Sequence, residues 1–241
     1  HMISVGNQAC TSIEDFIDEL CENEAVKVIG IHVEGIKNLN RFQKAILKCH
    51  KYQTPVVALK TGYSKIGSSI TVTHTGSLAG EAKYYDALFR RIGVIQVADP
   101  IQFLETLKFL SICGTPHNEK VMAFTCSGGG ATMVADLSET INLKLPDFSK
   151  EGIKKIKNLL PKIANVSNPL DYTTPIWGFP EKTYPVFIEA IKRSKAGTAI
   201  LVQDYPAPGL EDSKISYLND AKAFIEASAR LKISSAICST F

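Results

Sequence analysis

The sequence predicts an α/β fold in which two doubly wound parallel sheets follow one another along the chain. Apolar, β-branched runs alternate with stretches whose apolar residues recur at helical spacing, as expected for strands that alternate with helices. A polar segment with glycine and proline, residues 114–118, separates two such series. The length of 241 residues also suits two domains of ordinary size. We therefore expect one domain at residues 1–115 and a second at residues 116–241.

The first domain is expected to begin with an amphipathic helix that Thr11 or Ser12 can cap. The run Val26–Val33 that follows is rich in β-branched residues, as a strand buried in a parallel sheet requires. The same criteria predict the other elements. Strands are expected at residues 26–33, 55–59 and 94–97, and helices at residues 13–21, 39–51, 80–92 and 100–112.

The second domain repeats this alternation. Strands are expected at residues 121–126, 198–202 and 234–238, and helices at residues 131–140, 149–160, 182–193 and 212–231. Residues 168–175 are rich in turn formers and end in hydroxyls beside an acid, so they form either a site wall or a surface loop. Trp177 either lines a pocket or anchors a loop. Because a doubly wound unit would normally cover its last strand with a helix, we expect this domain to be truncated at its C-terminus.

Composition excludes several classes of protein. Apolar residues make up 45% and charged residues 21%, which argues against a disordered chain or a coiled coil. The net charge is +3 without a long basic run, so neither nucleic acid nor a membrane surface is an expected partner. No apolar run approaches about 18 residues, and no signal peptide opens the chain. The six cysteines are scattered, which favours a cytoplasmic setting over disulfides or a zinc site, and we expect no metal site.

The segment Thr73–Gly80 contains the strongest candidate for a functional residue. His74 lies between two hydroxyl residues, Thr73 and Thr75, and Gly76 follows at once. Small residues let the backbone approach an anion, and imidazole changes its bonding state near neutral pH. In the alternative interpretation, a threonine of this segment caps the next helix and His74 only packs or donates a hydrogen bond.

Two charged residues stand where predicted strands of the first domain end. Ligands of doubly wound sheets bind outside the carboxyl ends of the strands, and Glu34 and Lys60 both occupy such positions. Glu34 is either part of a site or an ordinary surface carboxylate. Lys60 either offsets the charge of a phosphate or is simply an exposed lysine.

The run Ser127–Gly130 connects a predicted strand to a predicted helix. A glycine-rich turn at this place directs backbone N–H groups toward the helix N-terminus, which favours anion binding. The run matches neither of the common glycine-rich nucleotide fingerprints. Tight packing of the helix against the strand is the alternative explanation of Gly128, Gly129 and Gly130.

Six motifs occur in one order along the chain. They are Ser4-Val5-Gly6-Asn7, Val33-Glu34-Gly35-Ile36, Ala58-Leu59-Lys60-Thr61-Gly62, Thr73-His74-Thr75-Gly76-Ser77-Leu78-Ala79-Gly80, Cys126-Ser127-Gly128-Gly129-Gly130 and Asn168-Pro169-Leu170-Asp171. Together they resemble the NDP-forming acyl-CoA synthetases, the superfamily of ADP-forming acetyl-CoA synthetase and succinyl-CoA synthetase. The likeness spans nearly the whole chain and implies two tandem flavodoxin-like domains. Its most specific part is the string that contains His74.

This resemblance implies a ligase that joins acyl-CoA breakdown to nucleotide phosphorylation through a phosphohistidine. His74 would carry the phosphoryl group, and Glu34 would accept a hydrogen bond from the other ring nitrogen and so fix the tautomer. Ser127, Gly128, Gly129 and Gly130 would form the start of a helix that faces the phosphoryl group, with Thr75, Gly76 and Lys60 as further phosphate contacts.

The resemblance also implies cofactors and partners. The full-length enzyme would use CoA, ATP or ADP and Mg²⁺, a small carboxylate or its acyl-CoA, and phosphate. We expect none of the cofactors to be bound tightly by this piece, which should lack full turnover. The family's CoA-binding domain would precede Ser4, and its ATP-grasp domain would lie in the same protein or on a partner subunit; neither has a counterpart here. A homo-oligomer is compatible with this interpretation.

Two other functions stay open. In the first, the chain is a ligand-sensing regulatory module of a lysine acetyltransferase fused to a synthetase-like region. The presence of both His74 and Glu34 argues against such a silent role. In the second, the chain is a stand-alone protein that binds a small acid or CoA, which leaves the string around His74 without an explanation.

Overall fold

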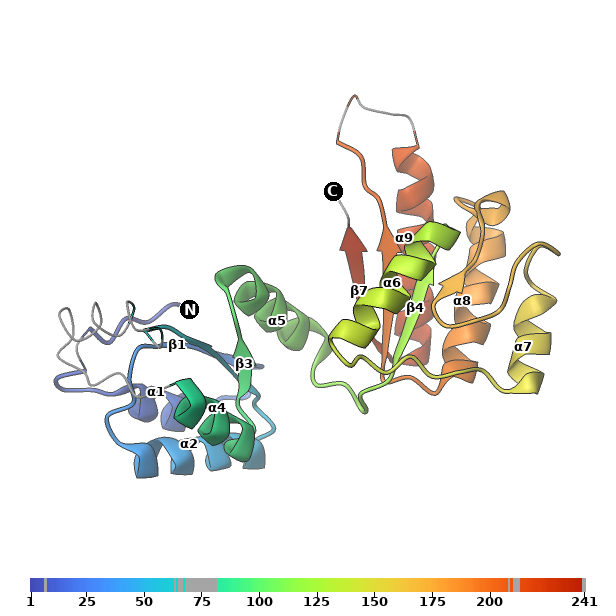
Figure 1. Ribbon diagram of the computed structural model, residues 1–241. Helices are drawn as coiled ribbons and strands as arrows, with labels where there is room; N and C mark the ends of the chain where they lie inside the picture. Colours follow the sequence, from blue (N-terminus) through green and yellow to red (C-terminus); the bar gives the residue numbers. More distant parts are fainter. Residues whose placement is uncertain are drawn as a thin grey trace. The chain divides into compact units, whose positions relative to one another are not determined.

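The computed structural model describes residues 1–6, 8–62, 64, 67, 82–207, 209 and 213–239. The chain divides into two compact units, His1–Gly114 and Thr115–Phe241, so the division falls within the polar segment at residues 114–118. Each unit contains its own parallel sheet with helices on it, and the two are described separately below (Figure 1). None of the described helices is both long and apolar enough to cross a membrane.

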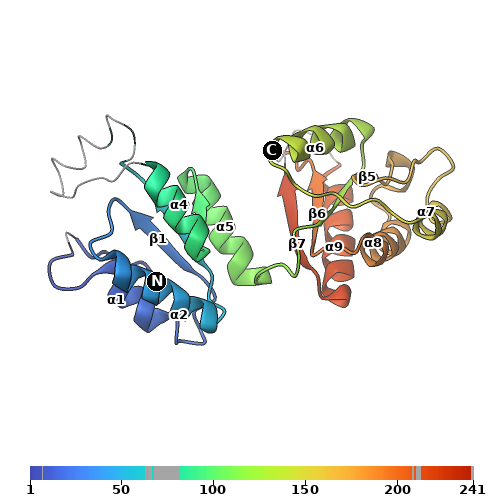
Figure 2. The same ribbon diagram turned by 60° about the horizontal axis from the view of Figure 1, so that its bottom comes forward.

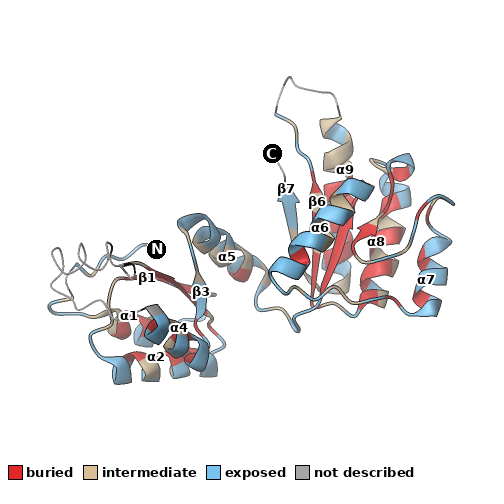
Figure 3. Cartoon of the chain, viewed as in Figure 1, coloured by how far each residue is buried: buried red, intermediate tan, exposed pale blue. Residues whose placement is uncertain are grey.

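The first unit contains a parallel sheet with the strand order β1-β2-β3. The strands are β1 (Ile29–Val33), β2 (Val56–Lys60) and β3 (Ile95–Val97), and the helices are α1 (Ile13–Leu20), α2 (Leu39–Lys51), α4 (Ala82–Ile92) and α5 (Pro100–Cys113). All five residues of the middle strand β2 are buried, because helices cover both faces of the sheet (Figure 3). The pairing of β1 with β2 sets Val33 beside Lys60, so the two strands end together.

The two faces of the first sheet pack against different helices. On β1, Ile31 and Val33 belong to the core that is shared with α1, α2 and α4. Gly30 points to the opposite face, where α5 lies closest: a Cβ atom at Gly30 would be 2.7 Å from Leu107 and 2.8 Å from Phe103. The absence of a side chain at Gly30 therefore lets α5 approach the strand.

The second unit contains a parallel sheet with the strand order β5-β4-β6-β7. The strands are β4 (Val121–Thr125), β5 (Leu170–Asp171), β6 (Thr198–Gln203) and β7 (Ser234–Ser239). The helices are α6 (Gly128–Thr140), α7 (Lys150–Lys157), α8 (Pro180–Ser194) and α9 (Lys214–Leu231), and a short 3-10 helix, η1, covers Thr174–Ile176. The chain leaves β4 for β5 on one side and returns to β6 on the other. A doubly wound sheet binds ligands where its strand order reverses in this way.

Helices α8 and α9 cover one face of the second sheet, and α6 covers the other (Figure 2). The core on the α8 and α9 side contains Phe124, Phe187 and Phe224, whose rings meet edge to face with centroids 5.0 to 5.9 Å apart. Thr125, the next residue along β4, points instead to α6. Alternation along β4 thus assigns the two faces to different helices.

The fold class predicted from the sequence is confirmed, and most predicted bounds differ from the observed ones by one to three residues. Two differences concern the candidate site. Helix α6 begins at Gly128 instead of Ala131, because Ser127 caps it: the Ser127 hydroxyl accepts a hydrogen bond from the Gly130 N–H at 3.3 Å. The glycines therefore form the first helical turn. The short strand β5 was not predicted, since a strand of two residues carries too little periodicity to be recognised.

We expect Phe187→Ala to destabilise the second unit by about 3 to 5 kcal/mol, because Phe187 is fully buried among three aromatic rings. Trp177 is the only tryptophan of the chain and lies in this unit, so urea unfolding followed by its fluorescence measures the change. Ile163→Ala, at a side chain that is 75% exposed, should change the free energy of unfolding by less than about 0.5 kcal/mol. Equal losses in the two variants would contradict the assignment of the core.

Candidate functional site

The carboxyl edge of the first sheet brings two predicted site residues close together. Glu34 follows β1 directly and is half-buried, and Lys60 is the last residue of β2. Because Val33 is paired with Lys60, Glu34 lies at the same edge as the lysine. The Thr61 N–H extends this pairing by donating to the Val33 carbonyl at 3.0 Å. The carboxyl ends of β1 and β2 therefore meet at one edge of the sheet, as their sequence positions predict.

Lys60 is buried, with only 2% of its surface exposed, so the alternative of an ordinary exposed lysine is wrong. Its ammonium lies 4.6 Å from the centre of the Tyr85 ring and donates to the Thr61 carbonyl. Burial lowers the pKa of Lys60, and the nearby charge of Glu34 opposes this shift. The ammonium therefore lies between the Tyr85 ring and the Thr61 carbonyl, next to the end of β2. A direct contact between Lys60 and phosphate stays a prediction.

Tyr85 is a member of this cluster that the sequence did not reveal. It is buried in the first turn of α4, and its hydroxyl accepts a hydrogen bond from the Ile36 N–H at 3.3 Å. The tyrosine thus contacts both the residues after β1 and the lysine at the end of β2. The only signal in the sequence was the position of Tyr85, a few residues beyond Thr73–Gly80. This signal was too weak to identify a site residue, because aromatic residues are common in helices for packing alone.

The segment that contains His74, Thr75 and Gly76 lies outside the described residues. Continuous description stops at Gly62, two residues after Lys60, and resumes at Ala82, three residues before Tyr85. The two ends of this longer stretch therefore lie near the cluster formed by Glu34, Lys60 and Tyr85. The roles of the three loop residues remain predictions.

The N-terminus of α6 follows the carboxyl end of β4 in the second unit. Ser127, Gly128 and Gly129 are exposed. The first N–H groups of a helix have no partner within the helix and carry a partial positive charge. A Cβ atom at Gly128 would be 3.5 Å from Asp171 Oδ2, so one carboxylate already lies beside this helix end.

The glycines at the start of α6 serve two different purposes. A Cβ atom at Gly130 would lie 2.6 Å from the Thr125 hydroxyl, so this glycine is needed for close packing of α6 on β4. At Gly129 the nearest atom would be the Ser127 hydroxyl at 3.7 Å, which is an ordinary contact. Packing therefore explains Gly130, whereas Gly128 and Gly129 leave the helix end accessible.

A buried carboxylate that the sequence did not reveal supports the residues after β5. Asp220, on α9, is fully buried and accepts hydrogen bonds from the Tyr172 hydroxyl at 2.8 Å, the Gly178 N–H at 3.0 Å and the Thr183 hydroxyl at 3.2 Å. Burial raises the pKa of Asp220, while these hydrogen bonds lower it. Asp220 thereby fixes both ends of the segment from Tyr172 to Gly178. An aspartate within a helix matches no motif, so sequence could not single it out.

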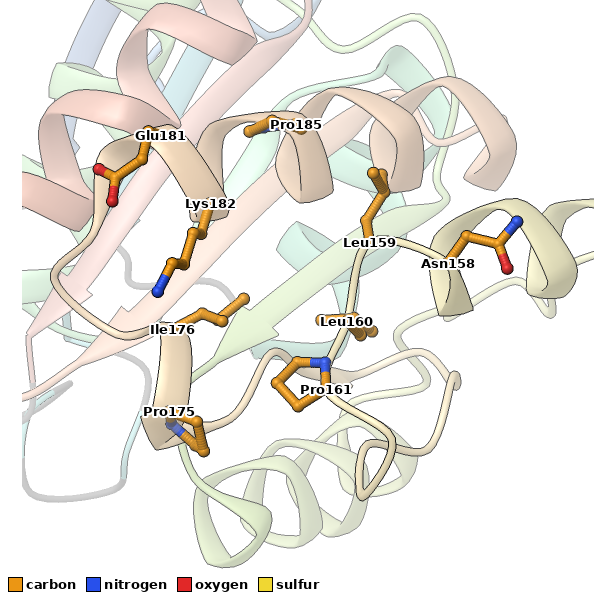
Figure 4. A pocket seen from close by; sticks show the side chains of 9 residues that line it. All are labelled: Asn158, Leu159, Leu160, Pro161, Pro175, Ile176, Glu181, Lys182 and Pro185. Carbon is orange, nitrogen blue, oxygen red and sulfur yellow. The ribbon is translucent and has the colours of Figure 1, made fainter.

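An open pocket of about 540 Å³ lies on another side of the second unit, between the end of α7, η1 and the start of α8 (Figure 4). Leu160 and Ile176 are its buried apolar residues, and Glu181 and Lys182 lie at its exposed rim. None of the predicted site residues lines it. Within the described ranges, no group of three or more His, Cys, Asp or Glu side chains could hold a metal ion.

Comparisons with known proteins agree on one family. Residues 1–110 match the family described as the succinyl-CoA ligase like flavodoxin domain. An ADP-forming acetate–CoA ligase of Methanocaldococcus jannaschii is 35% identical over 170 residues, which is 70% of this chain and 24% of that protein. The alpha subunit of ADP-forming acetate–CoA ligase II of Pyrococcus furiosus is 36% identical over 169 residues, 70% of this chain and 36% of that protein. The chain thus spans roughly a quarter to a third of these relatives.

A solved structure shows the same fold. The dinucleotide-forming acetyl-coenzyme A synthetase 1 of Candidatus Korarchaeum cryptofilum, in complex with phosphate and ADP, superimposes with a TM-score of 0.81. The match covers 98% of this chain and 49% of that protein at 22% identity. At this identity the likeness concerns the fold of the chain.

We expect Lys60→Met to remove a pH dependence of stability in the alkaline range. Because the folded pKa of Lys60 lies below its ordinary value of 10.5, the unfolded chain holds a proton between these two values that the folded chain has lost. The free energy of unfolding of the wild type should therefore rise with pH in this window, relative to that of Lys60→Met. Urea unfolding at several alkaline pH values measures the difference, and a constant difference would contradict the burial of the ammonium.

We expect Gly130→Ala to destabilise the second unit by about 1 to 3 kcal/mol, because its Cβ atom would collide with Thr125. Gly129→Ala is the matched control, and it should leave stability unchanged or raise it by up to about 1 kcal/mol. Adding Thr125→Ala should restore part of the stability that Gly130→Ala loses. Thermal unfolding of the three variants measures these effects, and equal behaviour of the two glycine variants would contradict the packing argument.

Proposed function

Because this chain belongs to the superfamily of NDP-forming acyl-CoA synthetases, we propose that it carries the phosphohistidine step of an acid–CoA ligase. The overall reaction converts acyl-CoA, NDP and phosphate into acid, CoA and NTP. The observation that carries the proposal is the cluster of Glu34, Lys60 and Tyr85, which lies where the described chain stops before His74 and resumes after it. The ordered set of six sequence motifs supports the same reaction.

In the proposed step, a neutral nitrogen of His74 attacks the phosphorus of an acyl phosphate. The bond between phosphorus and the acyl oxygen breaks, and the acid leaves as a carboxylate. Glu34 accepts the hydrogen bond of the other ring nitrogen, which fixes the tautomer and stabilises the positive charge that develops on the ring. The phosphoryl group then passes from His74 to NDP and gives NTP.

The remaining predicted residues have supporting roles in this proposal. The N–H groups of Gly128 and Gly129 bind phosphoryl oxygens at the positive end of α6, with Ser127 and Gly130 shaping that end. Thr75 and Gly76 are proposed as further phosphate contacts next to His74. The buried charge of Lys60 offsets the negative charge of Glu34 and of the phosphoryl group, without needing to touch it.

The complete reaction needs parts that we do not assign to the described residues. CoA, ATP or ADP and Mg²⁺ belong to the whole enzyme, and we propose that CoA-binding and ATP-grasp domains supply their sites from the same protein or from a partner subunit. The reported relatives give no support to a regulatory module of a lysine acetyltransferase.

We expect the chain to take up one phosphoryl group from acetyl phosphate, seen as an intact-mass increase that is lost after acid treatment. His74→Ala should abolish this adduct, because the nucleophile is gone. Glu34→Gln should slow its formation by about 10² to 10⁴, because the ring loses its orienting carboxylate. Intact-protein mass spectrometry over time measures both effects.

His117→Ala is the control, since it removes a different histidine, an exposed one, from the same chain. It should leave both the yield and the acid lability of the adduct unchanged. An acid-labile mass increase that persists in His74→Ala would overturn the proposed carrier role.

A further inference from the structure

We propose that Tyr85 is a positioning residue for the phosphohistidine step, because its hydroxyl fixes the backbone that carries Glu34. This inference rests on the proposed function for the role of Glu34 toward His74. The anchoring contact itself involves described residues of the first unit and does not depend on that reaction.

The connection between β1 and α2 carries Glu34 and is held at both of its ends. At its start, the Thr61 N–H donates to the Val33 carbonyl at 3.0 Å. At its end, the Asn38 N–H donates to Glu14 Oε1 at 3.3 Å, and Glu14 is buried on α1 with 2% of its surface exposed. The two ends of the connection are therefore fixed by partners from the end of β2 and from α1.

The Tyr85 hydroxyl holds the middle of the same connection. It accepts a hydrogen bond from the Ile36 N–H at 3.3 Å, and the Ile36 side chain packs, half-buried, on the core of the first unit. Ile36 lies two residues after Glu34, and two residues span at most about 7 Å. An anchored Ile36 therefore restricts where the backbone of Glu34 can lie.

The ring of Tyr85 is itself immobilised, which makes its hydroxyl a fixed point. Tyr85 is buried, and its ring meets that of Phe89 edge to face with the centroids 5.8 Å apart. The Lys60 ammonium lies 4.6 Å from the centre of the Tyr85 ring. A tyrosine side chain has only two χ angles, so little conformational freedom is lost when its hydroxyl is held in place.

Strand register explains why one tyrosine contacts both strand ends. Val33 pairs with Lys60, and paired residues of parallel strands point to the same face of the sheet. Val33 belongs to the core that also contains Tyr85 of α4. Lys60 therefore points to the side of the sheet that α4 covers and meets the ring there, while the hydroxyl reaches the Ile36 N–H just beyond β1.

The same hydrogen bond joins two parts of the chain that the proposed reaction brings together. Tyr85 lies in the first turn of α4, which begins at Ala82, beyond His74 in the chain. Ile36 belongs to the connection that carries Glu34. The bond therefore ties a helix beyond the proposed nucleophile to the backbone of its proposed orienting carboxylate.

Packing alone does not require the hydroxyl. Phe42 and Phe89 belong to the same core, and both are fully buried without one. The substitution Tyr85→Phe would keep the ring and its contacts with Phe89 and Lys60. If the hydroxyl only satisfied a backbone N–H, its removal would lower stability and leave the rate of phosphorylation unchanged. The positioning role predicts a slower rate instead.

Tyr85→Phe should slow the phosphorylation of the full chain by acetyl phosphate by about ten-fold, the effect of one lost hydrogen bond. In the Glu34→Gln background, the same substitution should change the rate by less than about two-fold, because the carboxylate that it positions is already gone. Tyr84→Phe is the matched control, since it removes the hydroxyl of the next residue, which is 64% exposed. It should leave the rate unchanged. Intact-protein mass spectrometry over time measures all of these rates.

Hydrogen exchange at the Ile36 amide tests the anchor without any reaction. The wild-type amide should be protected, and Tyr85→Phe should speed its exchange by about ten-fold, because the acceptor is gone. Tyr84→Phe should leave the exchange rate unchanged. Nuclear magnetic resonance of the labelled chain measures the exchange of this single amide.

The two measurements separate failure of the positioning role from failure of the proposed function. An unchanged phosphorylation rate in Tyr85→Phe would overturn the positioning role and keep the proposed function. Equal slowing by Tyr85→Phe with and without the Glu34 carboxylate would overturn it as well, because the tyrosine would then act by another route. Unchanged exchange at Ile36 would overturn the anchor. A wild type that forms no adduct would reject the proposed function and the role of Tyr85 in it, whereas faster exchange in Tyr85→Phe would still establish the anchor.

Discussion

Parallel pairing of neighbouring strands is the constraint on which the rest of this molecule depends. Parallel strands in register end at one edge of their sheet, so residues far apart in sequence are brought together there. In the first unit, the pairing of Val33 with Lys60 places Glu34 beside the lysine. In the second unit, the pairing of Thr125 with Asp171 brings the Asp171 carboxylate to the start of α6. Both candidate regions are consequences of strand register rather than of any single loop.

A buried ionisable side chain lies near each of these edges: Lys60 in the first unit and Asp220 in the second. An ion that is removed from water must be compensated, and Lys60 and Asp220 both are. Lys60 has an aromatic face and the charge of Glu34, and Asp220 has three hydrogen-bond donors. Apolar side chains would fill the same volumes without that cost. We therefore infer that the two charged groups hold neighbouring residues in place: Lys60 acts on Glu34, and Asp220 acts on the segment after β5.

Features that depend on local periodicity or on the position of strand ends could be predicted from the sequence. Features that depend on contacts between distant segments could not. The alternation of strands and helices, the two sheets and the placement of Glu34 and Lys60 at strand ends all follow from local patterns. The burial of Lys60 depends on Tyr85, which belongs to a helix that begins 22 residues later, and no local pattern reveals it. Asp220 is equally hidden, because its partners come from segments 37 to 48 residues away.

The glycines at the start of α6 show how local sequence pattern and three-dimensional contacts together explain one motif. From the sequence, close packing and anion binding were alternative explanations of one run of identical residues. In the structure, a Cβ atom at Gly130 would meet Thr125 on the buried side of the helix, whereas one at Gly129 would meet only the capping serine. One glycine therefore sets how closely α6 approaches the sheet, and its neighbours leave the helix end open. Because close approach brings that end to the carboxyl edge, the packing glycine determines where the proposed anion site would lie.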